Sequence, residues 1–223
     1  MELSIDTSTR YASIAISCEG IILRELSWSS KRNHSVELVS AITTLLNLQG
    51  ITINDLKVII TTKGPGAFSA LRVGMSTAKS MAFALSIPIV GISSMDVEVV
   101  PYCNFHKQVI GLIPAGKTRM YIATYDNCID TGDLRVEDTD FILNNLNEEY
   151  LYCGEGIALI ELQLKNNSRL KYVRNQNPTR RMSTLANLGF DKVKESDFDD
   201  LALLEPIYVR ASQIDSADRM LNK

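Results

Sequence analysis

Apolar and polar residues alternate along the first part of the chain. Three β-rich runs, Leu3 to Asp6, Tyr11 to Cys18 and Ile21 to Trp28, are separated by the polar stretches Ser8-Thr9-Arg10 and Glu19-Gly20. Alternation that is interrupted by turn residues is typical of strands that bury one face. The pattern therefore predicts that the chain begins with an antiparallel meander.

The spacing of apolar residues then changes to that of a helix, which stops at Gly50, a typical residue at a helix C-terminus. These apolar residues are Val36, Leu38, Val39, Ile42, Leu45 and Leu46. Residues 56–62 predict a buried strand, Ser69 is the expected N-cap of a helix that lasts to about Leu85, and residues 87–92 predict another strand. The order β-β-β-α-β-α-β predicts one mixed sheet flanked by helices.

A weaker version of the same order follows Pro101. We expect strands near residues 109–113, 120–125 and 134–138, then a helix from about Phe141. A strand at 151–153, a turn at 154–156 and a helix at 157–164 complete the series. The chain is therefore predicted to form two lobes of one architecture, residues 1–100 and residues 101–223, the second less regular and with a C-terminal extension. The pattern from residue 166 to residue 194 predicts no element.

Composition and charge narrow the class of protein. With 45% hydrophobic residues among 223, the chain can bury a large core, and a net charge of -3 gives no global basic field that would hold nucleic acid by itself. The sequence has no signal-peptide core and no apolar run of membrane-spanning length, so we expect a cytoplasmic protein without membrane contact. Four cysteines without a CxxC pair are expected to be reduced core thiols; they are Cys18, Cys103, Cys128 and Cys153.

Residues Gly111 to Thr118 match the pattern GxxxxGK followed by Ser or Thr, which defines the phosphate-binding P-loop. A P-loop leads directly into a helix, whose N-terminal N–H groups face the phosphates. The residues from Arg119 to Tyr125 are instead β-branched and aromatic, which predicts a hairpin strand. We therefore interpret the match, with Lys117 near its end, as accidental.

Two polar turns have the residues of a nucleotide site. Asp6 stands among hydroxyl residues at the end of the first strand, where actin-like and Hsp70-like ATPases hold metal and phosphate. Ser8 takes the place of a glycine that would let backbone N–H groups approach a phosphate, so the capping of a turn by Asp6 is the favoured interpretation. The turn that contains Gly64 and Gly66 leads into a helix, but such turns are common in tight connections.

Small residues recur every four positions on the second predicted helix, at Ala70, Gly74, Ala78 and Ala82. A stripe of this kind lets a sheet or another helix come very close. From the stripe alone, the sheet of the same lobe is the favoured neighbour, and a partner is the alternative. His34, beside a helix start, is expected to serve in local capping rather than in metal binding.

Five basic residues gather near the end of the second lobe. They are expected to form a solvated face, and a contribution to tRNA binding within a complex is the alternative. These residues are Arg169, Lys171, Arg174, Arg180 and Arg181.

Several motifs together resemble the TsaB (YeaZ) family, densely within residues 1–100 and again near the end. The resemblance implies a two-lobed actin/Hsp70-like fold (ASKHA, RNase H-like), an α/β architecture with mixed sheets flanked by helices. The motifs are Ile5-Asp6-Thr7-Ser8-Thr9, His34-Ser35, Gly64-Pro65-Gly66-Ala67-Phe68, Leu71-Arg72-Val73-Gly74, Ala78-Lys79, Ile87-Pro88-Ile89-Val90-Gly91-Ile92-Ser93-Ser94 and Glu205-Pro206-Ile207-Tyr208-Val209-Arg210.

The resemblance implies a non-catalytic subunit of the complex that forms N6-threonylcarbamoyladenosine next to the anticodon of tRNA. Such a subunit binds a TsaD-like transferase and a TsaE-like ATPase, meets tRNA only within the complex and needs no cofactor. Catalytic relatives have a metal-binding His-x-x-x-His motif where Ser94 and Glu98 stand here, and these two side chains are poor substitutes for imidazoles. Pro114 also replaces an aspartate that is common in the family.

The resemblance further places a partner surface on the two helices of the first lobe, for TsaD or for a second copy of the chain. Against the interpretation from the stripe alone, it implies contact roles for Leu38, Ile42, Leu45, Ala70, Gly74, Ala78 and Ala82. The resemblance also implies that the turns at Asp6, Ser8, Gly64 and Gly66 are remnants of a nucleotide site. The alternatives are an independent ATPase that uses Asp6 and the glycine turns or the P-loop match, and a peptidase, for which the sequence has no metal or nucleophile constellation.

Overall fold

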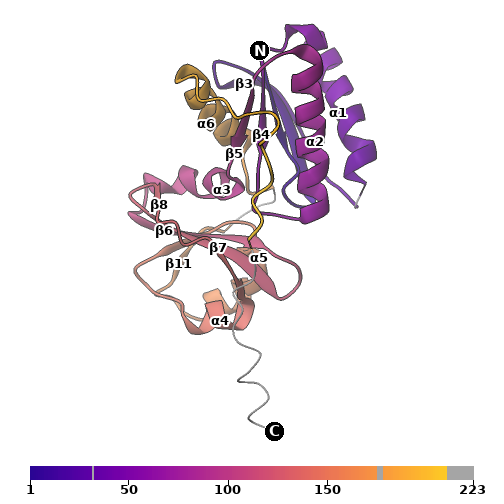
Figure 1. Ribbon diagram of the computed structural model, residues 1–223. Helices are drawn as coiled ribbons and strands as arrows, with labels where there is room; N and C mark the ends of the chain where they lie inside the picture. Colours follow the sequence, from indigo (N-terminus) through magenta and orange to yellow (C-terminus); the bar gives the residue numbers. More distant parts are fainter. Residues whose placement is uncertain (32, 175–177, 210–223) are drawn as a thin grey trace.

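The computed structural model describes residues 1–31, 33–174 and 178–209, and within them two β-sheets lie in two lobes, one above the other in Figure 1. Helices flank each sheet. This arrangement confirms the predicted α/β fold with mixed sheets. Within the described ranges, no helix has the length and apolarity needed to cross a bilayer.

The first sheet has five strands in the order β3-β2-β1-β4-β5. β1, β4 and β5 run parallel, and β1, β2 and β3 form the predicted antiparallel meander. Because parallel strands end at the same edge, Asp6 at the end of β1 and Thr62 at the end of β4 are neighbours there. The strands are β1 (Glu2–Asp6), β2 (Tyr11–Cys18), β3 (Ile21–Ser29), β4 (Val58–Thr62) and β5 (Ile89–Ile92).

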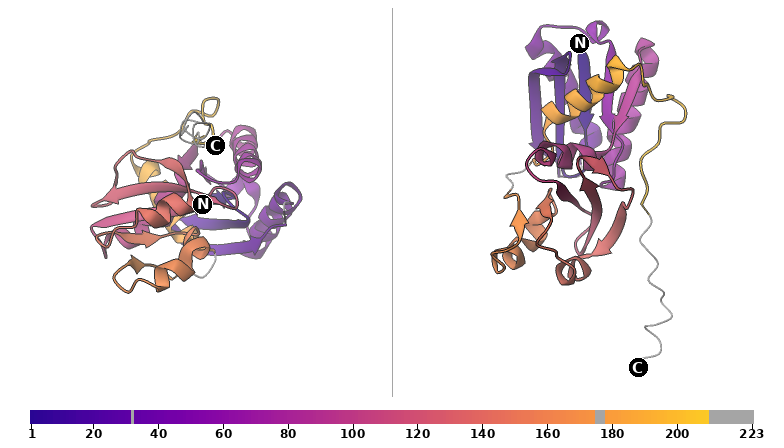
Figure 2. Two further views of the ribbon diagram at one scale, coloured as in Figure 1. Left: turned by 90° about the horizontal axis from the view of Figure 1, so that it is seen from below. Right: turned by 90° about the vertical axis from the view of Figure 1, so that its left-hand side faces the viewer.

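Helices cover both faces of the first sheet. On one face, α1 (His34–Gln49) and α2 (Phe68–Leu85) stand side by side, and their apolar residues share a core with β1, β2 and β4 (Figure 1). On the other face, α6 (Met182–Lys194) lies across the strands, as Figure 2 shows. A Cβ at Gly189 of α6 would come within 2.6 Å of the Ile60 side chain, so glycine permits this close contact.

The second sheet repeats the strand order of the first. β7 is antiparallel to both β6 and β9, and β10 and β11 run parallel to β6, which gives the order β9-β7-β6-β10-β11 with the short β8 also paired to β7. Helices α4 (Thr139–Asn144) and α5 (Ile157–Lys165) share a core with this sheet. The strands are β6 (Gln108–Pro114), β7 (Arg119–Asp126), β8 (Ile129–Asp130), β9 (Arg135–Asp138), β10 (Leu151–Cys153) and β11 (Lys171–Tyr172).

Two helices are exchanged between the lobes. α3 (Ser94–Cys103) follows the last strand of the first sheet, but Met95 and Val99 pack against the second sheet, whereas α6 follows the second sheet and packs on the first. The predicted boundary at residue 100 therefore falls inside a helix that covers the second sheet. The assignment of all residues from 101 to 223 to the second lobe is corrected for α6, because its apolar face is buried on the first sheet.

Several elements lie where none was predicted: α3, α6, β8, β11 and a 3-10 turn, η1 (Ile53–Asp55). The N-cap prediction for Ser69 is wrong, because α2 begins at Phe68 and its N-cap is Ala67. Arg210, the last residue of the C-terminal motif, lies outside the described residues.

Candidate functional site

Asp6 lies at the edge where β1 and β4 end, 2% exposed. Its Oδ1 accepts hydrogen bonds from the backbone N–H of Ser8 at 2.8 Å and from Oγ1 of Thr62 at 3.1 Å. The hydroxyl of Ser8 donates to Thr62 Oγ1 at 2.9 Å and forms a hydrogen bond with the hydroxyl of Ser94. Asp6 therefore caps its own turn, as predicted, and also binds the neighbouring strand.

Arg180 lies, in the sequence, between β11 of the second sheet and α6. Its side chain nevertheless contacts Asp6. Its side chain is 1% exposed, and its Nε donates to Asp6 Oδ2 at 2.8 Å. Its two terminal nitrogens donate to Glu155 Oε2 at 3.2 Å and to Thr9 Oγ1 at 2.8 Å. One guanidinium group thus joins the turn after β1 in the first lobe to the turn before α5 in the second.

A third buried carboxylate, that of Glu98 on α3, completes what we call the interlobe cluster: Asp6, Thr9, Glu98, Glu155 and Arg180. Oε1 of Glu98 accepts hydrogen bonds from the hydroxyl of Thr179 and from the backbone N–H of Glu155. Its Oε2 has no partner among the described residues. All five side chains of the cluster are 7% exposed or less.

The electrostatics of the cluster depend on Arg180. Burial alone would raise the pKa of Asp6, but the guanidinium and the hydrogen bonds from Ser8 hold that pKa below its ordinary value. Burial raises the pKa of Glu98, against the opposing effects of Arg180 and Thr179. Burial would lower the pKa of Arg180, and the nearby carboxylates raise it instead, so the guanidinium stays charged.

The glycine turn packs directly onto the turn after β1. The backbone N–H of Ala67 donates to the carbonyl oxygen of Ser8 at 2.6 Å, and a Cβ at Gly66 would lie 2.1 Å from that oxygen. Gly64 has a φ of +96°, a value that favours glycine. Gly64 and Gly66 therefore have a packing role in this protein, and their descent from a nucleotide site stays a prediction.

The small-residue stripe of α2 faces the sheet of its own lobe. A Cβ at Gly74 would lie 2.2 Å from Thr7 Oγ1, so only glycine fits at this position. The side chains of Ala78 and Ala82 are 0% and 1% exposed. This confirms the interpretation from the stripe alone and corrects the contact roles that the resemblance implied, because side chains buried in the lobe's own core cannot touch a partner. Leu38 and Leu45 are likewise fully buried in this core, whereas Ile42 lines a groove between α1 and α2 and Ala70 lines a cavity at the start of α2, so contact roles for Ile42 and Ala70 stay predictions.

The outer sides of α1 and α2 nevertheless form a groove of about 380 Å³. Val39 on α1 is 58% exposed there, and Met81 on α2 is half-buried. Hydroxyl residues also line the groove, and the buried residues Ile42 and Leu46 form the floor of the groove. These hydroxyl residues are Thr43, Ser76, Thr77 and Ser80.

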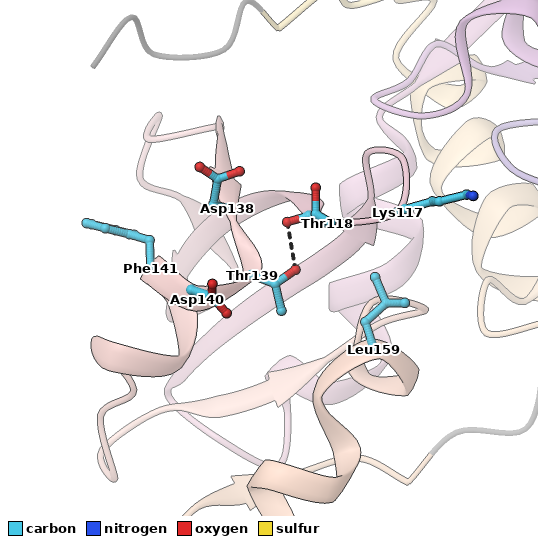
Figure 3. A pocket seen from close by; sticks show the side chains of 7 residues that line it. All are labelled: Lys117, Thr118, Asp138, Thr139, Asp140, Phe141 and Leu159. Atoms are coloured by element: carbon cyan, nitrogen blue, oxygen red, sulfur yellow. Dashed lines mark hydrogen bonds between the residues drawn. The ribbon is translucent and has the colours of Figure 1, made fainter. Parts of the chain in front are cut away.

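The P-loop match forms a hairpin, which confirms the prediction. β6 and β7 pair in antiparallel register, and the backbone N–H of Ala115 donates to the carbonyl of Arg119 at 2.8 Å across the connection. Lys117 lies at the tip, and its side chain extends away from the carboxylates of Asp138 and Asp140 (Figure 3). A strand, not a helix, follows Lys117, so helical N–H groups do not face this loop.

Other sequence-based expectations need correction. Arg180 is buried rather than part of a solvated basic face, although the other four basic residues are exposed. Asn33, not His34, is the N-cap of α1, and His34 is buried at its first position. Two of the four free cysteines, Cys18 and Cys128, are exposed rather than in the core. Within residues 1–31, 33–174 and 178–209, no group of three or more His, Cys, Asp or Glu residues is arranged to hold a metal ion.

The repeated strand order and the exchanged helices define an actin/Hsp70-like (ASKHA) fold. YeaZ of Pseudomonas aeruginosa shares the fold, with a TM-score of 0.72 and 20% identity over 93% of this chain and 99% of that chain. The activator of the 2-hydroxyisocaproyl-CoA dehydratase of Clostridium difficile, solved with bound ADPNP, has a TM-score of 0.52 and 12% identity over 87% and 95% of the two chains.

The sequence profile of the family described as "TsaD: tRNA N6-adenosine threonylcarbamoyltransferase" matches residues 22–177. The TsaB protein of Bacillus subtilis (strain 168) is 28% identical over 225 aligned positions, which cover 96% of each chain. The chain therefore belongs to the TsaD family, within its TsaB (YeaZ) group.

Replacement of Arg180 by Met is expected to lower the free energy of unfolding at neutral pH by about 3–5 kcal/mol, because two buried carboxylates lose their cation. Native Asp6 has a lowered pKa, so its contribution to stability is complete above about pH 4 and is lost as the pH falls further. In the variant the pKa of Asp6 is expected to rise above its unfolded value, so the stability deficit should shrink as the pH falls from 7 toward that value.

Urea unfolding between about pH 5 and 8 measures this deficit. The matched control is Arg181→Met, the same change at the exposed neighbouring residue. Equal losses of stability in the two variants, or a deficit in Arg180→Met that does not change with pH, would contradict the role assigned to Arg180.

Proposed function

We propose that the chain is a non-catalytic subunit of the complex that forms N6-threonylcarbamoyladenosine next to the anticodon of tRNA. The family match and the name of the B. subtilis relative, a tRNA threonylcarbamoyladenosine biosynthesis protein, support a role in this modification. The subunit binds and organises a TsaD-like transferase together with a TsaE-like ATPase. It works in the cytoplasm and meets tRNA only within this complex.

The observation that carries the non-catalytic role is the position of Arg180. Actin-like ATPases hold metal and phosphate between their lobes, near the carboxylate at the end of the first strand. Here the guanidinium bonds to that carboxylate, Asp6, and to Glu155 across from it, at 2.8 and 3.2 Å. A magnesium ion would need the same oxygens, and a phosphate would meet the carboxylates of Asp6 and Glu155 around a single cation.

The residues that stand where catalytic relatives have two metal-binding histidines support the same proposal. Ser94 and Glu98 lie one turn apart on α3, both buried. The hydroxyl of Ser94 bonds to Ser8, and Oε1 of Glu98 bonds to Thr179 and to the backbone of Glu155. These groups bind the protein itself, and burial favours the neutral form of Glu98, which is a poor metal ligand.

The α1–α2 groove is the proposed contact surface for the TsaD-like subunit or, in its absence, for a second copy of the chain. Its exposed apolar residues Val39 and Ile53 line it together with short hydroxyl residues that let a partner helix approach closely. The buried stripe contributes indirectly, because it holds α2 against the sheet and so fixes the shape of the groove.

Titration of the isolated protein with ATP and Mg²⁺ is expected to give no binding at micromolar concentrations, and the protein alone should not transfer a threonylcarbamoyl group to tRNA. Transfer should appear when a TsaD-like subunit, TsaE and threonylcarbamoyl-AMP are added. Micromolar, magnesium-dependent ATP binding that is lost in Asp6→Asn would instead establish the rival function, an independent ATPase.

The Lys117→Ala variant is expected to support tRNA modification at the unchanged rate in the reconstituted system, because the apparent P-loop is a hairpin. Quantification of the modified nucleoside by mass spectrometry measures this rate. A large loss of modification in a variant that melts at the normal temperature would restore a phosphate-binding role for the loop.

Substitution of Val39 by Glu, or of Ser80 by Arg, should weaken binding to the TsaD-like subunit by about tenfold or more and leave thermal melting unchanged, because a charge would face an apolar partner surface. The matched control is Leu48→Glu, which places the same charge at a 53% exposed residue of α1 that does not line the groove. Size-exclusion chromatography without the partner reports on the homodimer.

The Ala78→Arg variant should differ from the groove variants, because Ala78 is 0% exposed and a buried arginine should unfold the protein. If the two groove variants bind the partner as tightly as the Leu48→Glu control, the groove is not the contact surface.

A further inference from the structure

The helices α1 and α2 begin at the same edge of the first sheet. β3 and β4 both end at this edge, because each runs parallel to β1, and each leads into one of the two helices. The helices therefore run in the same direction, side by side in Figure 1. Between their N-termini lies a cavity of about 650 Å³, lined among others by Arg10, Ser30, His34, Ser35, Phe68 and Ser69.

The charges around this cavity favour an anion. The N-terminus of a helix acts like about half a positive charge, since its first N–H groups have no partner within the helix. The N-cap of α2, Ala67, has no side chain that accepts a hydrogen bond, and its first turn has no acidic residue. Exposed Arg10 adds a full positive charge.

The carboxylate of Asp6, in the interlobe cluster, acts on His34 against these charges. So does that of Glu37 in the first turn of α1. It accepts a hydrogen bond from Trp28 Nε1 at 2.9 Å and is not among the residues that line the cavity. The interlobe cluster is separate, because its arginine and carboxylates do not line this cavity.

His34 gives an independent indication of a ligand. It lines the cavity and is only 7% exposed, yet its Nδ1 has no hydrogen-bond partner among the described residues. An unpaired buried imidazole nitrogen costs free energy, which a group bound in the cavity would recover. Burial lowers the pKa of His34, while Glu37 and Asp6 act in the opposite sense, and a bound anion would raise this pKa.

We propose that this cavity binds a phosphate group, held by the first N–H groups of α2, by Arg10 and by His34. Arginine and a helix N-terminus are the groups that proteins use most readily for phosphate. The volume exceeds that of a bare phosphate and leaves room for the rest of a ligand. Two sources share this chemistry, a free phosphate compound and the phosphodiester backbone of an RNA, and the experiment separates them.

The test uses the two histidines of the chain, His34 and His106, as paired reporters. Ring resonances of isotope-labelled histidine are followed by NMR during separate titrations with inorganic phosphate, with metal-free ADP and with an anticodon stem-loop RNA. A bound phosphate group should shift the His34 signals and raise the pKa of His34. The signals of His106, whose Nδ1 bonds to the Gln108 carbonyl at 2.9 Å, should not move.

The Arg10→Gln variant should weaken the response of His34 by about tenfold, because it removes a charge-assisted hydrogen bond. The matched control, Arg72→Gln, changes an arginine that stacks on the Phe68 ring at 3.8 Å and does not line the cavity, so the response should persist. A response to phosphate and ADP identifies a free phosphate compound as the ligand, and a response to the RNA alone identifies a phosphodiester.

A His34 signal that all three probes leave unmoved, or a response that Arg10→Gln does not weaken, overturns the proposal. No magnesium is present and the interlobe cluster is unchanged, so this outcome would leave the proposed non-catalytic role intact.

Discussion

The position of the two lobes depends on the contact of Arg180 with Asp6 and Glu155. All three groups are nearly inaccessible to solvent, and a buried charge that loses its partner costs several kcal/mol. The partners come from the turn after β1, the turn before α5 and the segment that leads into α6. Separation of the lobes would break the hydrogen bonds of Glu155 with Arg180 and Thr9, because Asp6, Thr9 and α6 belong to the first lobe. The chain's own side chains therefore connect the two lobes at this point.

The exchange of α3 and α6 strengthens the same constraint with apolar contacts. Met95 and Val99 of α3 would collide with a Cβ at Gly111 of β6, at 2.4 and 2.6 Å, so this helix lies almost on the backbone of the second sheet. α6 approaches Ile60 of the first sheet as closely, through Gly189. Arg180 lies two residues before α6, so the packing of that helix also positions the guanidinium. The outer faces of α1 and α2 lie on the opposite side of the first sheet from α6, which leaves them available for a partner.

The sequence predicts the strands of the first sheet and the helices α1 and α2 well, because the helices have a regular apolar period and the fully buried strands β1, β4 and β5 are short apolar runs. It fails where a residue's role depends on distant parts of the chain. Arg180 bonds to Asp6, 174 positions away, and its basic neighbours made it look like part of a solvated face. α6 has a helical signal that the prediction missed, with Met182, Leu185, Ala186 and Gly189 at helical spacing. The small residues of α2 are a local pattern that the sequence reads correctly, because Gly74, Ala78 and Ala82 lie against the sheet of their own lobe.

The glycine turns show why the fold alone does not give the function. Gly66 must lack a side chain here because Ser8 lies against it, so its presence says nothing about a phosphate. A protein of this fold has been solved with bound ADPNP, and its likeness to this chain shows only the common architecture. What decides the chemistry is whether the positive charge between the lobes comes from a ligand or from the chain. Arg180 supplies it internally, whereas the charges around His34 and Arg10 face a cavity that the chain leaves open.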